Sequence, residues 1–302
     1  MNVAMRVAVG GGEGGELAVH RLGGGGDAGG PQGSGTGPDL LFVHATGFHG
    51  HVWAPLVSHL PARLRARALA LDVRGHGESA DSAPWPPGGM AWENLAVDIL
   101  GVVDGLEMER PLAVGHSSGA SLLLLAEELR PGTFAGLYCI EPIGTPTEEP
   151  PPPDPTHALA DGARRRRQLF ASRQEAFDNY RTKPPFAGVA PEAAWAYVEH
   201  GFADVPAQEG GGVRLRCLPE VEADMYTHGL AHPAFRDLRR VRCPVVVAGG
   251  DRSDAVSGDV LIAWAARLGD ARVEVFAGLG HFAPLEDPAA VAGGVAGAFA
   301  PG

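Results

Sequence analysis

The chain has 302 residues, of which 45% are hydrophobic and 20% charged, and its formal net charge at pH 7 is −12. This length suits one large α/β domain or a domain with an insertion, and the acidic balance disfavours nucleic acid or an anionic membrane as the main partner. No run approaches the roughly 18 apolar residues that span a bilayer, and the amino-terminal residues lack a secretory signal. We therefore expect a cytoplasmic protein.

The first half of the chain alternates between strand and helix signals. Strands are predicted over residues 3–9, 16–22, 39–44, 66–72, 112–114 and 134–140, and helices over 50–60, 92–106 and 118–129. The first two strands form a hairpin signal, and the glycine-dominated tract 23–37 is predicted to be a mobile surface loop. Alternation of this kind is typical of a doubly wound, mostly parallel sheet.

The alternation stops at the proline-rich residues 144–155, which predict a stiff connector. Residues beyond it read as helical, over 158–172, 174–180, 191–202 and 219–228. We interpret this region as an inserted helical cap, which divides the chain into core residues 1–143, cap residues 144–240 and core residues 241–302. The four consecutive arginines at 164–167 are interpreted mainly as a solvated helix face, with binding of an anionic substrate or cofactor tail as the alternative.

Alternation resumes after the cap, with a buried strand predicted over residues 243–250, a helix over 260–268 and a strand over 272–276. A loop that contains His281 follows, and the last helix is predicted over 288–299.

The sequence gives no sign of a metal or cofactor site. Cys139, Cys217 and Cys243 are widely spaced and form no Cys-x-x-Cys pair, so we expect buried free thiols in a reducing compartment. No His-Glu-x-x-His or comparable cluster is present. We expect no cofactor and no metal, and a small-molecule substrate as the partner. The sequence leaves open whether the protein is a monomer or a homodimer.

One motif carries recognisable chemistry. Residues 115–119, Gly-His-Ser-Ser-Gly, fit the pattern Gly-x-Ser-x-Gly between a predicted strand and a predicted helix. A serine at such a corner lies in strained backbone that exposes its hydroxyl, and glycines on either side allow strand and helix to pass closely. Ser117 is therefore a candidate nucleophile.

Five short segments, taken together, resemble the α/β-hydrolases that carry a helical cap. In chain order they are residues 42–47 (Phe-Val-His-Ala-Thr-Gly), 72–77 (Asp-Val-Arg-Gly-His-Gly), 115–119, 249–254 (Gly-Gly-Asp-Arg-Ser-Asp) and 278–281 (Gly-Leu-Gly-His). The resemblance implies an eight-stranded, mostly parallel sheet and a catalytic serine. It also assigns structural roles to His44 and His76.

Apart from the acid, the resemblance implies catalytic roles for four residues. A serine hydroxyl needs a base, and His281 follows the serine in the order typical of the family, so Ser117 is the expected nucleophile and His281 the expected base. The backbone amides of Thr46 and Ser118 are the expected oxyanion donors.

The acid that orients the histidine remains open between three carboxylates. Asp254 is favoured because related sequences place an aspartate at the end of the Gly-Asp-Arg-Ser-Asp pattern. Glu141, which ends an apolar predicted strand, is the second candidate, and Asp251 is the third.

The expected activity is hydrolysis of a carboxylic ester or thioester with a small hydrophobic acyl group. Similarity to family members that hydrolyse acyl-CoA favours a thioester modestly. Hydrolysis of carbon–carbon bonds in ring-cleavage products is one alternative, and a non-catalytic small-molecule-binding protein is another. Four aromatic side chains are predicted to contact the substrate, namely Phe48, Trp53, Tyr180 and Phe186.

Overall fold

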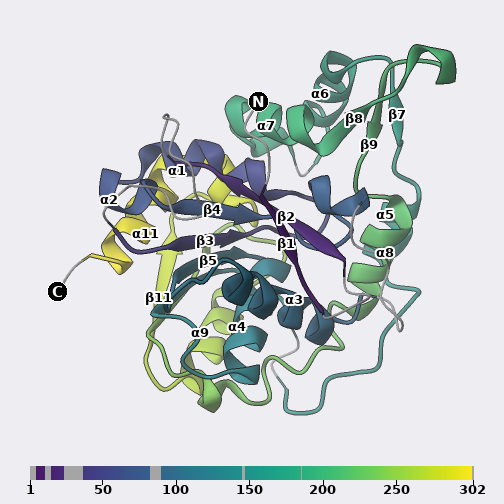
Figure 1. The fold of residues 1–302 in the computed structure, drawn as a ribbon. Coiled ribbons are helices and arrows are strands. Elements are labelled where there is room, and N and C mark those ends of the chain that lie inside the picture. Colours follow the sequence, from purple (N-terminus) through teal and green to yellow (C-terminus); the bar gives the residue numbers. More distant parts are fainter. Residues whose placement is uncertain are drawn as a thin grey trace.

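The computed structural model describes residues 5–10, 15–23, 37–81, 90–144, 147–184 and 186–300. The predicted glycine-rich loop lies outside the described residues except at its two ends. Eight strands form one sheet in the order β1-β2-β4-β3-β5-β6-β10-β11 (Figure 1). Their bounds are β1 Met5–Ala8, β2 Glu16–Arg21, β3 Leu40–Val43, β4 Ala68–Leu71, β5 Leu112–His116, β6 Gly136–Ile140, β10 Val245–Gly250 and β11 Ala271–Phe276.

The sheet is mostly parallel, as predicted. β2 pairs antiparallel with β1 and with β4, and all other neighbouring strands are parallel. Every residue of β3, β4, β6 and β10 is buried, which agrees with the continuous apolar runs of these strands. The strand order brings the carboxyl ends of β5, β6 and β10 side by side.

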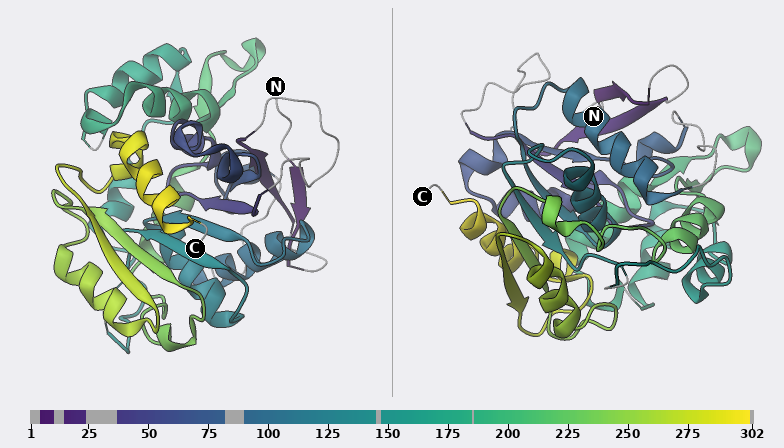
Figure 2. Two further views of the ribbon diagram at one scale, coloured as in Figure 1. Left: turned by 90° about the vertical axis from the view of Figure 1, so that its left-hand side faces the viewer. Right: turned by 90° about the horizontal axis from the view of Figure 1, so that it is seen from below.

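Helices cover both faces of the sheet (Figures 1 and 2). One face carries α1 (Ala54–His59), α2 (Ala62–Arg65) and α11 (Pro288–Ala298), and the other carries α3 (Trp92–Gly105), α4 (Ser118–Leu129) and α9 (Gly258–Arg267). Each face has its own apolar cluster. In the part of the chain that is described, no helix has the length and apolar character needed to cross a bilayer.

The region between β6 and β10, for which we keep the name cap, lies beside and above the sheet in Figure 1. It contains α5 (Ala158–Arg164), α6 (Arg173–Arg181), α7 (Pro191–Gly201) and α8 (Pro219–His228), and α5 packs against α8. α7 contacts α1 and the short helix α10 (Ala283–Glu286) of the core.

The cap is not wholly helical, in contrast to the prediction. The strands β7 (Leu169–Phe170), β9 (Val213–Leu215) and β8 (Phe202–Asp204) form a small antiparallel sheet. The helix expected over 158–172 ends at Arg164, because Phe170 pairs with Val213 instead and is buried against the ring of Phe202. The strand segments are only two or three residues long, too short to show a periodic pattern.

Candidate active site

The turn between β5 and α4 holds Ser117 in the expected strained backbone. Ser117 has φ 55° and ψ −119°, and its amide donates to the carbonyl of Ile140 at 2.8 Å. A Cβ atom at Gly119 would lie 2.3 Å from the carbonyl oxygen of Val43, and one at Gly115 would lie 2.6 Å from the backbone of Ala120. Both glycines are therefore required by close backbone contacts, and the corner presents Ser117 at the carboxyl edge of the sheet.

Glu141 and the partly exposed His281 form a pair beside this corner. Residue 116 pairs with Ile140 across β5 and β6, so Ser117 and Glu141 follow the ends of neighbouring strands. Nδ1 of His281 lies 2.5 Å from Oε2 of Glu141, and the Glu141 side chain is fully buried. The bond to Glu141 holds the proton on Nδ1, which leaves Nε2 as the acceptor nitrogen.

The end of β10 and the loop that follows it support Glu141. The amide of Gly250 donates to Oε1 of Glu141 at 3.0 Å, and the hydroxyl of Ser253 donates to Oε2 at 2.6 Å. These bonds supply the partners that a buried carboxylate needs. The sequence favoured a carboxylate of this segment as the acid, whereas in the structure it is Ser253 of this segment that contacts Glu141.

The preference for Asp254 does not agree with this geometry. The Asp254 side chain is exposed, and the structure pairs His281 with Glu141 instead. Asp251 is also exposed, and it accepts a hydrogen bond from the amide of Gly278 at 2.7 Å. Asp254 lies four residues beyond β10, whereas Glu141 follows β6 directly, so strand pairing places Glu141 nearer to the serine corner.

A second contact fixes the loop of His281. A ring nitrogen of His116, Nε2, lies 2.8 Å from the carbonyl oxygen of His281. Burial holds the pKa of His116 well below its usual value, so its ring is neutral and donates from Nε2. The residue that precedes Ser117 therefore holds the backbone of the residue that pairs with Glu141.

The turn that contains Thr46 is held by two neutral histidines. The amide of Gly47 donates to Nε2 of His76 at 3.0 Å, and Nε2 of His44 accepts from the amide of Val73 at 2.9 Å. Burial lowers the pKa of His44 to about 3 and also lowers that of His76. Among the described residues, the amides of Thr46 and Ser118 have no internal acceptor, so both remain available to an oxyanion.

An aromatic cluster connects this site to the cap. The ring of Phe48 lies 5.5 Å from that of Phe282, 5.8 Å from that of Phe186 and 5.1 Å from that of Tyr197, and Tyr180 lies 5.2 Å from Phe186. The structure thus brings together three of the four predicted substrate contacts.

Trp53 lies apart from this cluster. It is 1% exposed, and its ring lies 5.1 Å from that of Phe42 in β3, which places it in the core against the sheet. The prediction that Trp53 contacts substrate has no support from this packing. The sequence does not distinguish an aromatic side chain that packs in the core from one that contacts substrate, because both can follow a glycine-rich loop.

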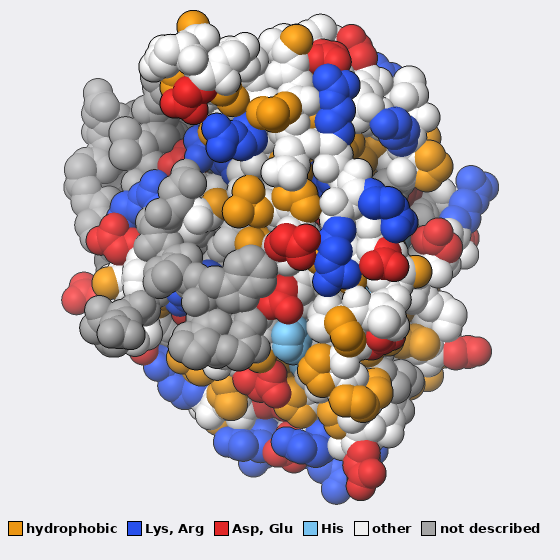
Figure 3. Space-filling view, turned by 90° about the vertical axis from the view of Figure 1, so that its right-hand side faces the viewer, with side chains coloured by type: hydrophobic (Ala, Val, Ile, Leu, Met, Phe, Trp, Pro, Cys, Tyr) orange, Lys and Arg blue, Asp and Glu red, His pale blue; other side chains and the backbone are white. Residues whose placement is uncertain are grey.

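Three of the four arginines at 164–167 are exposed, as predicted for a solvated face, and Arg166 is the exception. Arg164 and Arg167 are partly exposed and pair with carboxylates, and basic and acidic side chains are interspersed on this face of the cap (Figure 3). Arg166, however, lies beyond the end of α5 with its side chain only 17% exposed, and it forms an ion pair with Glu222 of α8. No sequence pattern distinguishes Arg166 from its neighbours.

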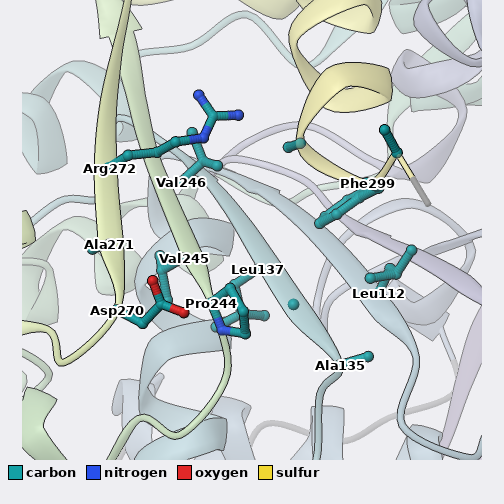
Figure 4. Close-up of a pocket in the computed structure, with 13 residues that line it drawn as sticks. Leu112, Ala135, Leu137, Pro244, Val245, Val246, Asp270, Ala271, Arg272 and Phe299 are labelled. Carbon is teal, nitrogen blue, oxygen red and sulfur yellow. The ribbon is translucent and has the colours of Figure 1, made fainter. Parts of the chain in front are cut away.

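Other features of the described residues are the side chains of metal-ligand types, the cysteines and a pocket elsewhere in the structure. No three His, Cys, Asp or Glu side chains among the described residues are grouped to hold a metal ion. The three cysteines are free and buried, as expected. The pocket in Figure 4 is lined by residues such as Leu112, Ala135 and Pro244, at the end of β5, β6 and β10 opposite to Ser117. This pocket therefore lies apart from Ser117, Glu141 and His281.

Comparison with known proteins identifies the family and agrees with the fold. The family model described as "Alpha/beta hydrolase family" matches residues 40–293. The 2-(acetamidomethylene)succinate hydrolase of Mesorhizobium japonicum is 29% identical over 252 residues, which cover 82% of this chain and 83% of that protein. A pimeloyl-[acyl-carrier protein] methyl ester esterase of Methylococcus capsulatus is 35% identical over 114 residues, but this match covers only 37% of this chain and 39% of the esterase.

Solved structures show the same fold. A crystal structure of E-2-(acetamidomethylene)succinate hydrolase superposes with a TM-score of 0.77 at 23% identity, covering 98% of both chains. The thioesterase domain from the curacin biosynthetic pathway superposes with a TM-score of 0.71 at 20% identity, covering 97% of this chain and 99% of that domain.

Proposed function

Because this chain belongs to the α/β-hydrolase family, we propose that it is a serine hydrolase that cleaves a carboxylic ester or thioester through an acyl-enzyme on Ser117. The observation that carries the proposal is the pair of buried Glu141 with His281 beside the serine corner. The hydrolases and esterases among the relatives support the reaction class. In this proposal Glu141, and not Asp254, is the acid.

The first step forms the acyl-enzyme. The Ser117 hydroxyl attacks the scissile carbonyl carbon while Nε2 of His281 takes its proton, and the carbonyl electron pair moves onto the oxygen. The amides of Thr46 and Ser118 donate to this oxyanion, and Glu141 stabilises the imidazolium. Collapse of the intermediate expels the alcohol or thiol, which receives the proton from His281.

The second step releases the acid. Water replaces the alcohol or thiol, loses a proton to Nε2 of His281 and attacks the acyl carbon on Ser117. The Ser117 oxygen leaves and recovers a proton from His281. The rings of Phe48 and Phe186 offer an apolar surface for the acyl group, which agrees with a small hydrophobic acyl substrate.

The proposal is tested with a fluorophosphonate probe and a substrate panel. We expect the folded protein to be labelled on Ser117, and Ser117→Ala to lose labelling and at least about 10³-fold in kcat. Comparing kcat/KM for acyl-CoA, p-nitrophenyl ester and lactone substrates then identifies the bond that is cleaved. Absence of labelling in folded protein, or turnover that survives Ser117→Ala, would contradict the proposal.

A further inference from the structure

Four cap residues form a buried polar network around Arg166. Nη1 of Arg166 pairs with Oε2 of Glu222, and Nη2 donates to the hydroxyl oxygens of Tyr180 at 2.8 Å and Tyr197 at 2.5 Å. The partners come from α8, α6 and α7, so one guanidinium connects three cap helices. A single Nη2 atom bonds both phenols, which places the two hydroxyl groups close together.

The network lies against the turn that supplies the Thr46 amide. A Cβ atom at Gly47 would lie 2.9 Å from Oε1 of Glu222 and 3.3 Å from Nη1 of Arg166. The rings of Tyr180 and Tyr197 also belong to the aromatic cluster that reaches Phe282, the neighbour of His281. The two phenols therefore lie where the acyl part of a substrate on Ser117 would meet the cap.

Both phenols hold an unused donor. Each oxygen accepts from Arg166, and within the described part of the chain neither hydroxyl hydrogen has an acceptor. Tyr197 is only 2% exposed, and burial raises its pKa well above the usual value, so it keeps its hydrogen. Tyr180 is partly exposed, so the cost of a buried donor without an acceptor falls on Tyr197, and this indicates that a ligand supplies the missing oxygen.

The charges of Arg166 and Glu222 determine which kind of ligand oxygen can bind to the two phenols. Glu222 is 8% exposed on its side chain and offsets the positive charge of Arg166 within the same network. A carboxylate would place a second buried anion near Glu222, which is unfavourable unless another cation accompanies it. A neutral carbonyl oxygen accepts two hydrogen bonds and adds no charge.

We propose that Tyr180 and Tyr197, held in place by Arg166, bind a second, neutral carbonyl oxygen in the acyl part of the substrate. The acyl group is then that of a keto acid or an amide-bearing acid, and Glu222 excludes acyl groups that end in a carboxylate. This inference rests on the proposed acyl-enzyme on Ser117 and names the substrate class of that site.

The test compares methyl esters that differ in one group. The keto esters are methyl 4-oxopentanoate, methyl 5-oxohexanoate and methyl 6-oxoheptanoate, and each is paired with the methyl alkanoate of equal length. At one length or more we expect kcat/KM to favour the keto ester by about tenfold or more, as two hydrogen bonds allow. A ratio near one at every length would overturn the proposal.

Variants test whether the preference for keto esters depends on the two phenols and on Glu222. The double variant Tyr180→Phe/Tyr197→Phe is expected to bring the keto-to-alkanoate ratio near one, whereas the control Tyr138→Phe, which removes a buried phenol of β6, keeps the ratio. For wild-type protein, kcat/KM is expected to be about tenfold higher for methyl 4-oxopentanoate than for monomethyl succinate. The substitution Glu222→Gln is expected to reduce this difference in kcat/KM. A ratio retained in the double variant, or a preference for monomethyl succinate, would overturn the proposal.

Binding to Ser117→Ala protein separates this proposal from the proposed function. Calorimetry with the same ester pairs should show tighter binding of a keto ester, and the phenylalanine substitutions should remove that difference. Keto preference in binding without turnover by wild-type protein would contradict the acyl-enzyme and leave the subsite standing. Turnover of esters with no keto preference in either assay would contradict the subsite alone.

Discussion

The sheet edge and the cap stabilise their polar side chains by different means. At the edge, Glu141 accepts from the amide of Gly250, and the Thr46 turn is held by a bond from the Gly47 amide to His76. In the cap, Arg166 is held by side chains on three separate helices. Groups that are fixed by strand pairing follow from the fold, whereas the cap network depends on how three helices pack around Arg166. The difference suggests that chemistry and specificity have separate structural origins in this protein.

The largest expected effect concerns the acid at the sheet edge. Glu141→Gln removes the charge that orients His281, and we expect kcat to fall by about 10³–10⁴-fold. Asp254→Asn, on an exposed side chain, is expected to change kcat by less than about threefold. Steady-state kinetics on one ester substrate measures both, and a large loss in Asp254→Asn with little loss in Glu141→Gln would reverse the assignment.

The second prediction concerns the stability of the cap network. Arg166→Met leaves Glu222 as a buried carboxylate without its cation, so we expect the free energy of unfolding to fall by about 3 kcal/mol. Arg167→Met is the matched control, because its pair with Glu175 is largely exposed and should contribute about 1 kcal/mol or less. Urea unfolding measures both values, and equal losses would show that the cap network has no special role in stability.

The smallest effect concerns pH at the boundary between core and cap. Burial lowers the pKa of His49 to about 4, and its Nε2 lies 3.0 Å from the carbonyl oxygen of Tyr197 in α7. The unfolded chain binds a proton near pH 6.5 while the folded chain does not, so stability is complete above pH 6.5 and declines as the pH falls towards 4. The slope from this histidine is about 1.4 kcal/mol per pH unit.

Urea unfolding at pH 7.5 and pH 5.5 measures this decline. His49→Gln should reduce the difference between the two pH values by about 1 kcal/mol, and the exposed control His59→Gln should leave it unchanged. If His49→Gln leaves the difference at its wild-type size, the histidine does not couple pH to stability.

The sheet and the serine corner were predictable because their signals are local and repeated. The apolar run of β5, the glycines at 115 and 119 and the apolar helix that follows all specify the same strand–turn–helix unit, and α4 begins at Ser118 and ends at Leu129 as predicted. The alternation of strand and helix signals, together with the family resemblance, likewise predicted the mostly parallel eight-stranded sheet.

The acid and the cap network were not predictable in the same way. Glu141 and Asp254 both follow apolar strands, and the choice between them depends on which strand end lies beside Ser117. Arg166 looks like its three neighbours in sequence, and its partner Glu222 is 56 residues away on another helix. Long-range side-chain pairs of this kind leave no periodic or compositional signal.

The close approach of Gly119 to Val43 has a consequence for variation and engineering. Because even a methyl group at position 119 would meet the backbone of β3 at 2.3 Å, the start of α4 is fixed to the strand that leads into the Thr46 turn. This main-chain contact, together with the bond from the Gly47 amide to His76, therefore helps to set the spacing between the Thr46 and Ser118 amides. In a library of variants, position 119 should therefore accept glycine alone.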